Sequence, residues 1–154
     1  SVRVDTSNLN VHELKHFIVR EFGKNTRTGG ELRVRVLSFG FRYGVPAEAD
    51  LVFDVRFLPN PHFAPGLRNK TGRNRDVAKM ALGHRMGARF LKKVKDLTTF
   101  LLPLYQAEGK VYLTVAVGCT GGKHRSVATV EDLARSFEAK GYQVELAHRD
   151  INRS

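Results

Sequence analysis

A glycine-rich stretch at residues 118–126 contains the residue types best suited to binding an anion. It reads Gly-Cys-Thr-Gly-Gly-Lys-His-Arg-Ser, between an apolar run at residues 111–117 and a segment with helical periodicity. A helix that begins at such a turn directs unpaired N–H groups and the positive end of its dipole at the turn. Gly121 and Gly122 allow the backbone to approach a ligand closely, and Arg125 can direct two N–H groups at one phosphate. The stretch, called the anion loop below, predicts a site for a phosphate-sized anion.

The anion loop also contains a Cys-x5-Arg-Ser pattern, formed by Cys119, Arg125 and Ser126, which is typical of cysteine-dependent phosphatases. In those enzymes a thiolate attacks phosphorus while the arginine holds the phosphate oxygens. Histidine usually precedes that cysteine, whereas Gly118 stands here, and no aspartate is an evident general acid. A lone cysteine at a tight turn is more often a small packed residue. We therefore predict a binding site without a catalytic residue, with a phosphatase as the alternative.

Two further kinds of site fit the residues poorly. A nucleotide-hydrolysing P-loop needs Ser or Thr after its lysine, but His124 follows Lys123. A metal site is not predicted, because the chain has one cysteine and no cluster of carboxylates and histidines at ligand spacing. His62 and His148 are the histidines expected to edge a ligand crevice, where imidazole can hydrogen-bond a sugar hydroxyl or a phosphate.

The chain alternates between strand and helix patterns, and this order predicts the fold class. Strands are expected at residues 31–39, 51–57, 111–117 and 143–147, and helices at residues 10–23, 76–82, from 88 to about 104, and 126–140. Pro103 is expected to kink or end the third of these helices, whose predicted buried stripe is Phe90, Leu91, Val94, Leu97, Leu101 and Leu104. The fourth helix is expected to end before Gly141 and to have an inner face of Val127, Val130, Leu133, Ala134 and Phe137. Strands separated by helices predict an α/β fold in three layers, with a mostly parallel sheet flanked by helices. Ligands of such sheets bind beyond the carboxyl ends of the strands, where residues 38–41, 60–62, 119–126 and 148–150 are expected to converge.

The net charge of +11 is concentrated in one segment. Residues 66–95 hold ten lysines and arginines against Asp76 alone, so about 30 residues contain most of the excess positive charge. This local excess favours a polyanionic partner, with RNA or DNA ahead of a membrane surface. The candidate RNA contacts are Arg68, Lys70, Arg73, Arg85, Arg89, Lys92 and Lys93.

Length and composition predict one soluble domain over residues 1–154. No apolar run approaches the ~20 residues of a membrane helix, and the single cysteine excludes an intramolecular disulfide, which favours the cytoplasm. The chain opens on Ser1 rather than Met, so we expect a trimmed domain of a longer protein.

Several segments together resemble the C-terminal domain of the RapZ family, the bacterial RNase adapter proteins. They are the anion loop, Val-Leu-Ser-Phe-Gly-Phe-Arg-Tyr-Gly at residues 36–44, Asp-Val-Arg-Phe-Leu-Pro-Asn-Pro-His-Phe at residues 54–63, and His-Arg-Asp at residues 148–150. The resemblance covers nearly the whole chain. It implies a phosphofructokinase-like sugar-phosphate fold, and a separate N-terminal P-loop nucleotide-binding domain that is absent from this chain, so no cofactor is expected here.

The resemblance also implies a function. Members sense glucosamine-6-phosphate, bind small regulatory RNA, present it to a ribonuclease and form homo-oligomers. This chain ends Ile-Asn-Arg-Ser rather than in the lysine-rich tail of enterobacterial members, which leaves the RNA and the ribonuclease unspecified. The resemblance places sugar-phosphate contacts on His62, Thr120, Gly121, Gly122, His124, Arg125 and Ser126, and Cys119 and Lys123 of the same loop complete the predicted set.

Overall fold

The structure, a computed structural model, describes residues 31–153. The helix predicted over residues 10–23 and the loop at 24–30 lie outside the described residues. The strands are β1 (Arg33–Gly40), β2 (Leu51–Asp54), β3 (Tyr112–Cys119) and β4 (Gln143–His148). The α-helices are α2 (Arg75–Leu82), α3 (Arg85–Glu108) and α4 (Arg125–Ala139), and the short 3₁₀ helices are η1 (Phe41–Tyr43) and η2 (Pro61–Phe63).

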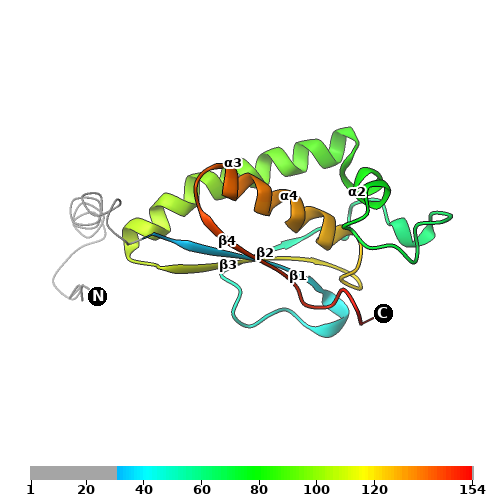
Figure 1. Cartoon of the computed structure of the whole chain (residues 1–154), viewed down its shortest axis with the longest axis horizontal. Coiled ribbons are helices and arrows are strands. Elements are labelled where there is room, and N and C mark those ends of the chain that lie inside the picture. The colour runs from blue at the N-terminus through cyan, green and yellow to red at the C-terminus, as the bar shows by residue number, and fades with distance from the viewer. Residues whose placement is uncertain (1–30, 154) are drawn as a thin grey trace.

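The four described strands form a parallel sheet in the order β2-β3-β1-β4. The predicted α/β class with a parallel sheet is therefore confirmed. The described α-helices lie over one face of the sheet, and the segment between η1 and β2 passes along the other (Figure 1). β1 and β3 occupy the middle of the sheet and are buried over most of their length, as expected for central strands of a parallel sheet.

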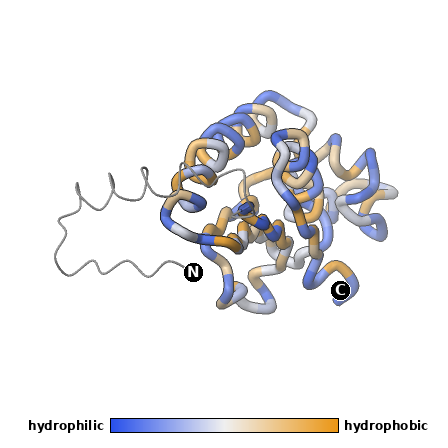
Figure 2. The backbone as a smooth tube through the Cα atoms, turned by 60° about the vertical axis from the view of Figure 1, so that its left-hand side comes forward, coloured by the Kyte–Doolittle hydropathy of each residue, from blue (hydrophilic) through white to orange (hydrophobic). Residues whose placement is uncertain are grey.

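Helix α4 packs directly on the sheet, against β1, β3 and β4. Its predicted inner face is confirmed, because Val127, Val130, Leu133, Ala134 and Phe137 are all buried. Hydropathy alternates along the helices, with apolar stretches on the side of the core (Figure 2). The helix ends at the predicted position, where Gly141 adopts a φ of 91° that favours glycine.

Helix α3 differs from its prediction in two respects. It begins three residues earlier and continues past Pro103 to Glu108, ending at the left-handed Gly109. Pro103 does not end the helix because it is exposed, so the carbonyl left without an N–H partner can be hydrated. The predicted buried stripe is partly wrong, because Leu97 and Leu104 are 46% and 44% exposed. The buried residues are Gly87, Leu91, Val94, Thr98 and Leu102.

Strand β2 is shorter than predicted, ending at Asp54 rather than residue 57. The cause is local: the Arg56 backbone N–H and guanidinium both donate to the Asp54 carboxylate, and Leu58 N–H donates to the Val55 carbonyl. These bonds turn the chain out of the sheet ahead of Pro59. The turn leaves the Arg56 and Leu58 carbonyls free to accept hydrogen bonds from elsewhere.

Candidate anion-binding site

A cavity of about 250 Å³ lies at the carboxyl end of the sheet, where the anion loop meets η1 and η2. Seven of the nine predicted ligand-binding residues line it: His62, Cys119, Thr120, Gly121, Lys123, His124 and Arg125. The structure thus brings most of the predicted set together, and their role as anion ligands stays a prediction. Gly122 and Ser126 do not line the cavity: Gly122 packs on the end of β1, and the Ser126 hydroxyl lies 3.1 Å from the Cys119 sulfur.

The anion loop rests against the end of β1. Gly122 has a φ of 78°, and a Cβ on it would lie 2.7 Å from the Gly40 nitrogen. Asp150, fully buried, accepts a hydrogen bond of 2.8 Å from the Gly40 N–H and others from Arg149. Burial alone would raise the pKa of Asp150, but the hydrogen bonds from Arg149 and Gly40 outweigh it and lower the pKa below its ordinary value. An ionised Asp150 therefore braces the strand end on which Gly122 packs.

Arg125 is the cation most firmly built into the site. Its side chain is buried, at 5% exposed. Nη1 donates to the carbonyls of Arg56 and Leu58 at 2.7 and 3.2 Å, and Nη2 donates to the Thr120 hydroxyl at 3.2 Å. The Arg125 guanidinium is thus held across the turn that follows β2, and no carboxylate among residues 31–153 forms an ion pair with it.

One donor of this guanidinium has no partner. The Arg125 Nε atom is buried and makes no hydrogen bond. Leaving a buried donor unpaired is costly, more so on a charged group. Arg125 is also the first residue of α4, whose first turn lacks a side-chain cap. The uncapped N-terminus of α4, with the positive end of its dipole, and the buried guanidinium of Arg125 therefore occur together beside the cavity.

His124 lines the cavity from a buried position. Its Nε2 atom lies 3.1 Å from the Arg68 carbonyl oxygen, so the ring also holds the basic loop that precedes α2. Burial lowers the pKa of His124 below its ordinary value, and the hydrogen bonds of the ring to the backbone of Arg68 and Lys70 oppose this shift only in part. A neutral imidazole here leaves the positive charge of the site mainly to Arg125, Lys123 and Arg42.

Cys119 lines the cavity but packs into the core. It is 2% exposed, belongs to the buried apolar cluster, and its sulfur lies 3.1 Å from the Ser126 hydroxyl. A phosphatase nucleophile needs an accessible sulfur that can approach phosphorus in line. The arrangement here matches a small packed side chain, which was the expectation from the sequence.

The prediction that His148 edges the crevice is wrong. Its side chain is 4% exposed, with Nδ1 2.7 Å from the Ser38 hydroxyl and Nε2 2.9 Å from the Glu131 carboxylate. Glu131 also pairs with Arg73 at 3.1 Å. Burial would raise the pKa of Glu131, but the hydrogen bonds from His148 and Arg73 outweigh it and lower the pKa. The ring lies on the α4 side of β4 because its neighbour Ser38, on β1, offers the partner there.

The sequence reasoning missed two residues that line the cavity, Arg42 and Phe63, and it identified a third, Asn60, only as part of a loop expected to converge there. The Arg42 N–H donates to the Thr120 carbonyl at 3.1 Å, and Asn60 caps η2 by accepting from the His62 N–H. Arg42 follows the carboxyl end of β1 by two residues, and that position was the signal that could have identified it.

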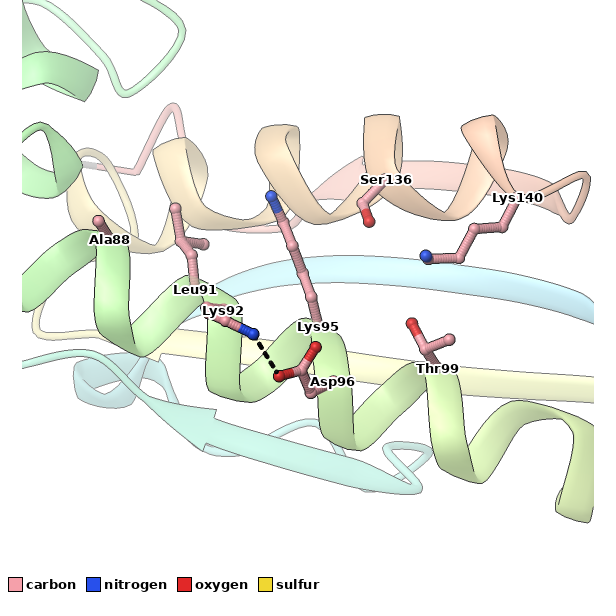
Figure 3. Close-up of a pocket in the computed structure, with 8 residues that line it drawn as sticks. All are labelled: Ala88, Leu91, Lys92, Lys95, Asp96, Thr99, Ser136 and Lys140. Carbon is pink, nitrogen blue, oxygen red and sulfur yellow. Dashed lines mark hydrogen bonds and ion pairs between the residues drawn. The ribbon is translucent and has the colours of Figure 1, made fainter.

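The seven predicted RNA contacts are all exposed, but they do not form one continuous groove. Arg85, Arg89 and Lys93 line one hollow on α3. Arg73 lines another between α2 and α4, and Lys92 lines a third between α3 and α4. In the third hollow Lys92 is paired with Asp96 at 3.0 Å (Figure 3).

The described part of the chain offers neither a cluster of metal ligands nor a helix that could span a membrane. Residues 31–153 contain no group of three or more His, Cys, Asp and Glu side chains that could hold a metal ion. None of the helices described is both long and apolar enough to cross a membrane.

The fold and the site define an α/β domain with an anion-binding cavity at the carboxyl end of a parallel sheet. The profile of the family described as the RapZ C-terminal domain matches residues 32–152. The chain therefore belongs to this family, which confirms the resemblance seen in the sequence.

Curated relatives are similar to this chain over nearly its whole length. A protein named nucleotide-binding protein from Anaeromyxobacter sp. (strain K) is 51% identical over 150 residues, covering 97% of this chain and 50% of the relative. Similar proteins named nucleotide-binding protein occur in Myxococcus xanthus, 49% identical over 97% of this chain and 52% of the relative, and in Geobacillus kaustophilus, 48% identical over 97% and 49%. The chain spans about half the length of these relatives.

Proposed function

We propose that this domain is a regulatory sensor that binds the phosphate of a small amino-sugar phosphate, glucosamine-6-phosphate, in the cavity beside the anion loop. The single observation that supports the phosphate site best is Arg125: a buried guanidinium without a carboxylate partner, and with a free Nε donor, lies at the uncapped start of α4. A bound phosphate would supply the negative charge that this group lacks. The choice of an amino sugar rests on the family.

The remaining lining residues suit the sugar. His62 and Asn60 come from η2 and its N-cap, opposite the anion loop, and both carry groups able to hydrogen-bond hydroxyls. A cavity of about 250 Å³ suits one small polar metabolite rather than a larger cofactor. The buried sulfur of Cys119 favours binding over catalysis.

We also propose that the exposed basic residues bind RNA, so that the domain couples a metabolite to an RNA partner. The excess positive charge supports this part, since neutralising phosphates with lysine and arginine provides most of the free energy of nonspecific RNA binding. A bound sugar phosphate would reduce the positive field near Lys123 and Arg42, which gives a direct electrostatic route to competition. Presentation of RNA to a ribonuclease, homo-oligomer formation and a cytoplasmic location are further parts of this proposal.

Calorimetric titration of the chain with glucosamine-6-phosphate tests the sensor. We expect saturable heat that returns to baseline after each injection, weaker binding of inorganic phosphate, and no binding of glucosamine. Gly121→Ala is a matched variant, because the new Cβ meets no atom within 4 Å yet adds a methyl group at a residue that lines the cavity. It should weaken binding while leaving the melting temperature nearly unchanged.

Two other results would contradict the proposal. Sustained heat with release of inorganic phosphate, abolished by Cys119→Ser, would show that the domain is a phosphatase. Absence of heat with every phosphate compound would remove the anion site and leave RNA binding as the only function to test.

A further inference from the structure

An exposed aromatic groove lies between α3 and the turn that follows β2, outside the cavity beside the anion loop. Its volume is about 670 Å³, and it is lined by Phe57, Arg85, Met86, Arg89, Phe90 and Lys93. Phe57 is 51% exposed and Met86 is 45% exposed. The Phe57 and Phe90 rings meet edge to face, with centroids 5.1 Å apart and an angle of 74°. Phe57 therefore presents a fixed aromatic ring to solvent.

The cations of this groove are free of acidic partners. Arg85, Arg89 and Lys93 recur every four residues and so follow one side of α3, about 6 Å apart along its axis. No carboxylate in residues 31–153 forms an ion pair with any of the three, whereas Lys92 and Lys95 of the same helix pair with Asp96 and Asp132. The basic charge beside the aromatic rings is thus the charge left available for a ligand.

This combination selects one kind of ligand. A row of cations attracts a chain of phosphates, and an exposed phenyl ring offers a surface for a flat base. A base inside a duplex is stacked on its neighbours and cannot reach the ring, whereas an unpaired base can. A purely apolar protein partner would gain nothing from three unpaired cations, which it would have to desolvate.

We propose that this groove binds single-stranded RNA, with an unpaired base stacked on Phe57 and the backbone phosphates on Arg85, Arg89 and Lys93. The inference rests on the RNA-binding part of the proposed function and specifies both the form of RNA and the residues that recognise it. It also assigns binding to Phe57, which charge alone does not identify.

The groove is joined to the anion loop through the backbone on either side of Phe57. The carbonyls of Arg56 and Leu58 both accept hydrogen bonds from Arg125 Nη1, at 2.7 and 3.2 Å. Arg125 therefore fixes the turn that carries the Phe57 ring. A ligand that binds the Arg125 guanidinium would therefore contact a side chain that holds this turn. The metabolite site is in this way physically connected to the aromatic groove.

Fluorescence anisotropy with labelled RNA tests whether an unpaired base stacks on Phe57 in this groove. The probes are a single-stranded uridine 12-mer, the same backbone with abasic positions, and a blunt RNA duplex of equal length. Phe57→Leu removes the aromatic face but keeps an apolar side chain, and circular dichroism checks its fold. We expect it to weaken binding of the uridine strand by about 5- to 150-fold, the range for loss of one stacked base, with the salt slope unchanged and the duplex and abasic affinities unaffected.

Two companion variants separate stacking from charge. Phe57→Trp should restore binding of the uridine strand, because it restores an aromatic face. Arg89→Ala should weaken binding of the strand and of the abasic backbone alike and should flatten the salt dependence.

The outcomes distinguish base stacking in the aromatic groove from RNA binding by the domain in general. Wild-type affinity of Phe57→Leu for the uridine strand would overturn the proposal that a base stacks on Phe57, and it would leave the proposal of RNA binding intact. Failure of the wild-type chain to bind any of the RNAs would overturn both proposals. Binding of a polyglutamate peptide that depends on Phe57, without binding of the uridine strand, would show that the groove is a site for an acidic protein partner instead.

Discussion

Replacing Arg125 by alanine perturbs the one side chain that connects the anion loop, the turn after β2 and the start of α4. The guanidinium donates three hydrogen bonds, to the Arg56 and Leu58 carbonyls and the Thr120 hydroxyl. At about 1 kcal/mol for each bond, their loss would reduce the free energy of unfolding by about 3 kcal/mol. Removal of a buried charge that lacks a carboxylate partner offsets part of this loss. We expect a net destabilisation of about 1–3 kcal/mol.

The effect on ligand binding is expected to be separate and measurable. A charge-assisted hydrogen bond between guanidinium and phosphate contributes about 1.5–3 kcal/mol, so Arg125→Ala should weaken glucosamine-6-phosphate binding by about 10- to 150-fold. Titration calorimetry well below the melting temperature measures this affinity on folded protein. Urea unfolding followed by circular dichroism measures the stability in parallel.

Arg125→Lys separates charge from geometry. Lysine keeps the positive charge but lacks the planar fork, so it cannot hold the turn and a phosphate together. We expect it to recover only a small part of the lost affinity. Wild-type affinity in Arg125→Ala would falsify the assignment of this loop as the phosphate site, and wild-type affinity in Arg125→Lys would show that charge alone is sufficient.

Three further perturbations follow from the same contacts. Gly72→Ala should lower the free energy of unfolding by about 1–3 kcal/mol, because its Cβ would lie 2.2 Å from the His124 carbonyl oxygen. Gly121→Ala, with open space at its Cβ, is the control. Equal urea midpoints for the two variants would contradict the predicted clash at Gly72. Because the folded-state pKa of His124 is lowered, the unfolded state binds more protons just below pH ~6.5, so stability should fall as pH drops through that window. His124→Gln should flatten the pH dependence of the free energy of unfolding, measured by urea titrations at each pH. An unchanged pH profile in this variant would contradict the assignment of the dependence to His124. The double variant Lys92→Ala, Lys93→Ala should reduce the slope of log affinity for single-stranded RNA against log salt by about 0.7–1.4. The smaller value is expected if Lys92 stays paired with Asp96 and does not contact a phosphate. A wild-type slope would mean that neither lysine contacts RNA.

Local patterns were sufficient for most of the secondary structure. The α4 prediction succeeded because its five inner apolar residues recur at helical spacing and all are buried. The α3 prediction failed in part because that helix packs on other helices at an angle the sequence does not state. Its spacing permits several apolar stripes, and in the structure, where α3 packs on α2 and α4, Thr98 and Leu102 are buried while Leu97 is exposed.

The chemistry of the anion loop was readable in the sequence because its parts are contiguous. Glycines, cations and a helix start occur within nine residues, so local geometry alone brings them together. His148 shows the opposite case. Its place at a strand end predicted a role in the crevice, but whether a side chain at such an end faces the ligand or the core depends on its partners, and Ser38 and Glu131 draw this ring inward.

The sequence by itself thus determined the α/β class, the anion loop and the excess of basic charge, since each depends on residue types and on spacing within one segment. The tertiary structure alone decided which cations remain free and which side chains meet. Arg125 reaches the Arg56 and Leu58 carbonyls across a separation of more than 65 positions, and Phe57 meets Phe90 beside unpaired arginines. Such contacts follow from how strands are ordered and how helices pack, and these are properties of the whole fold rather than of any one segment.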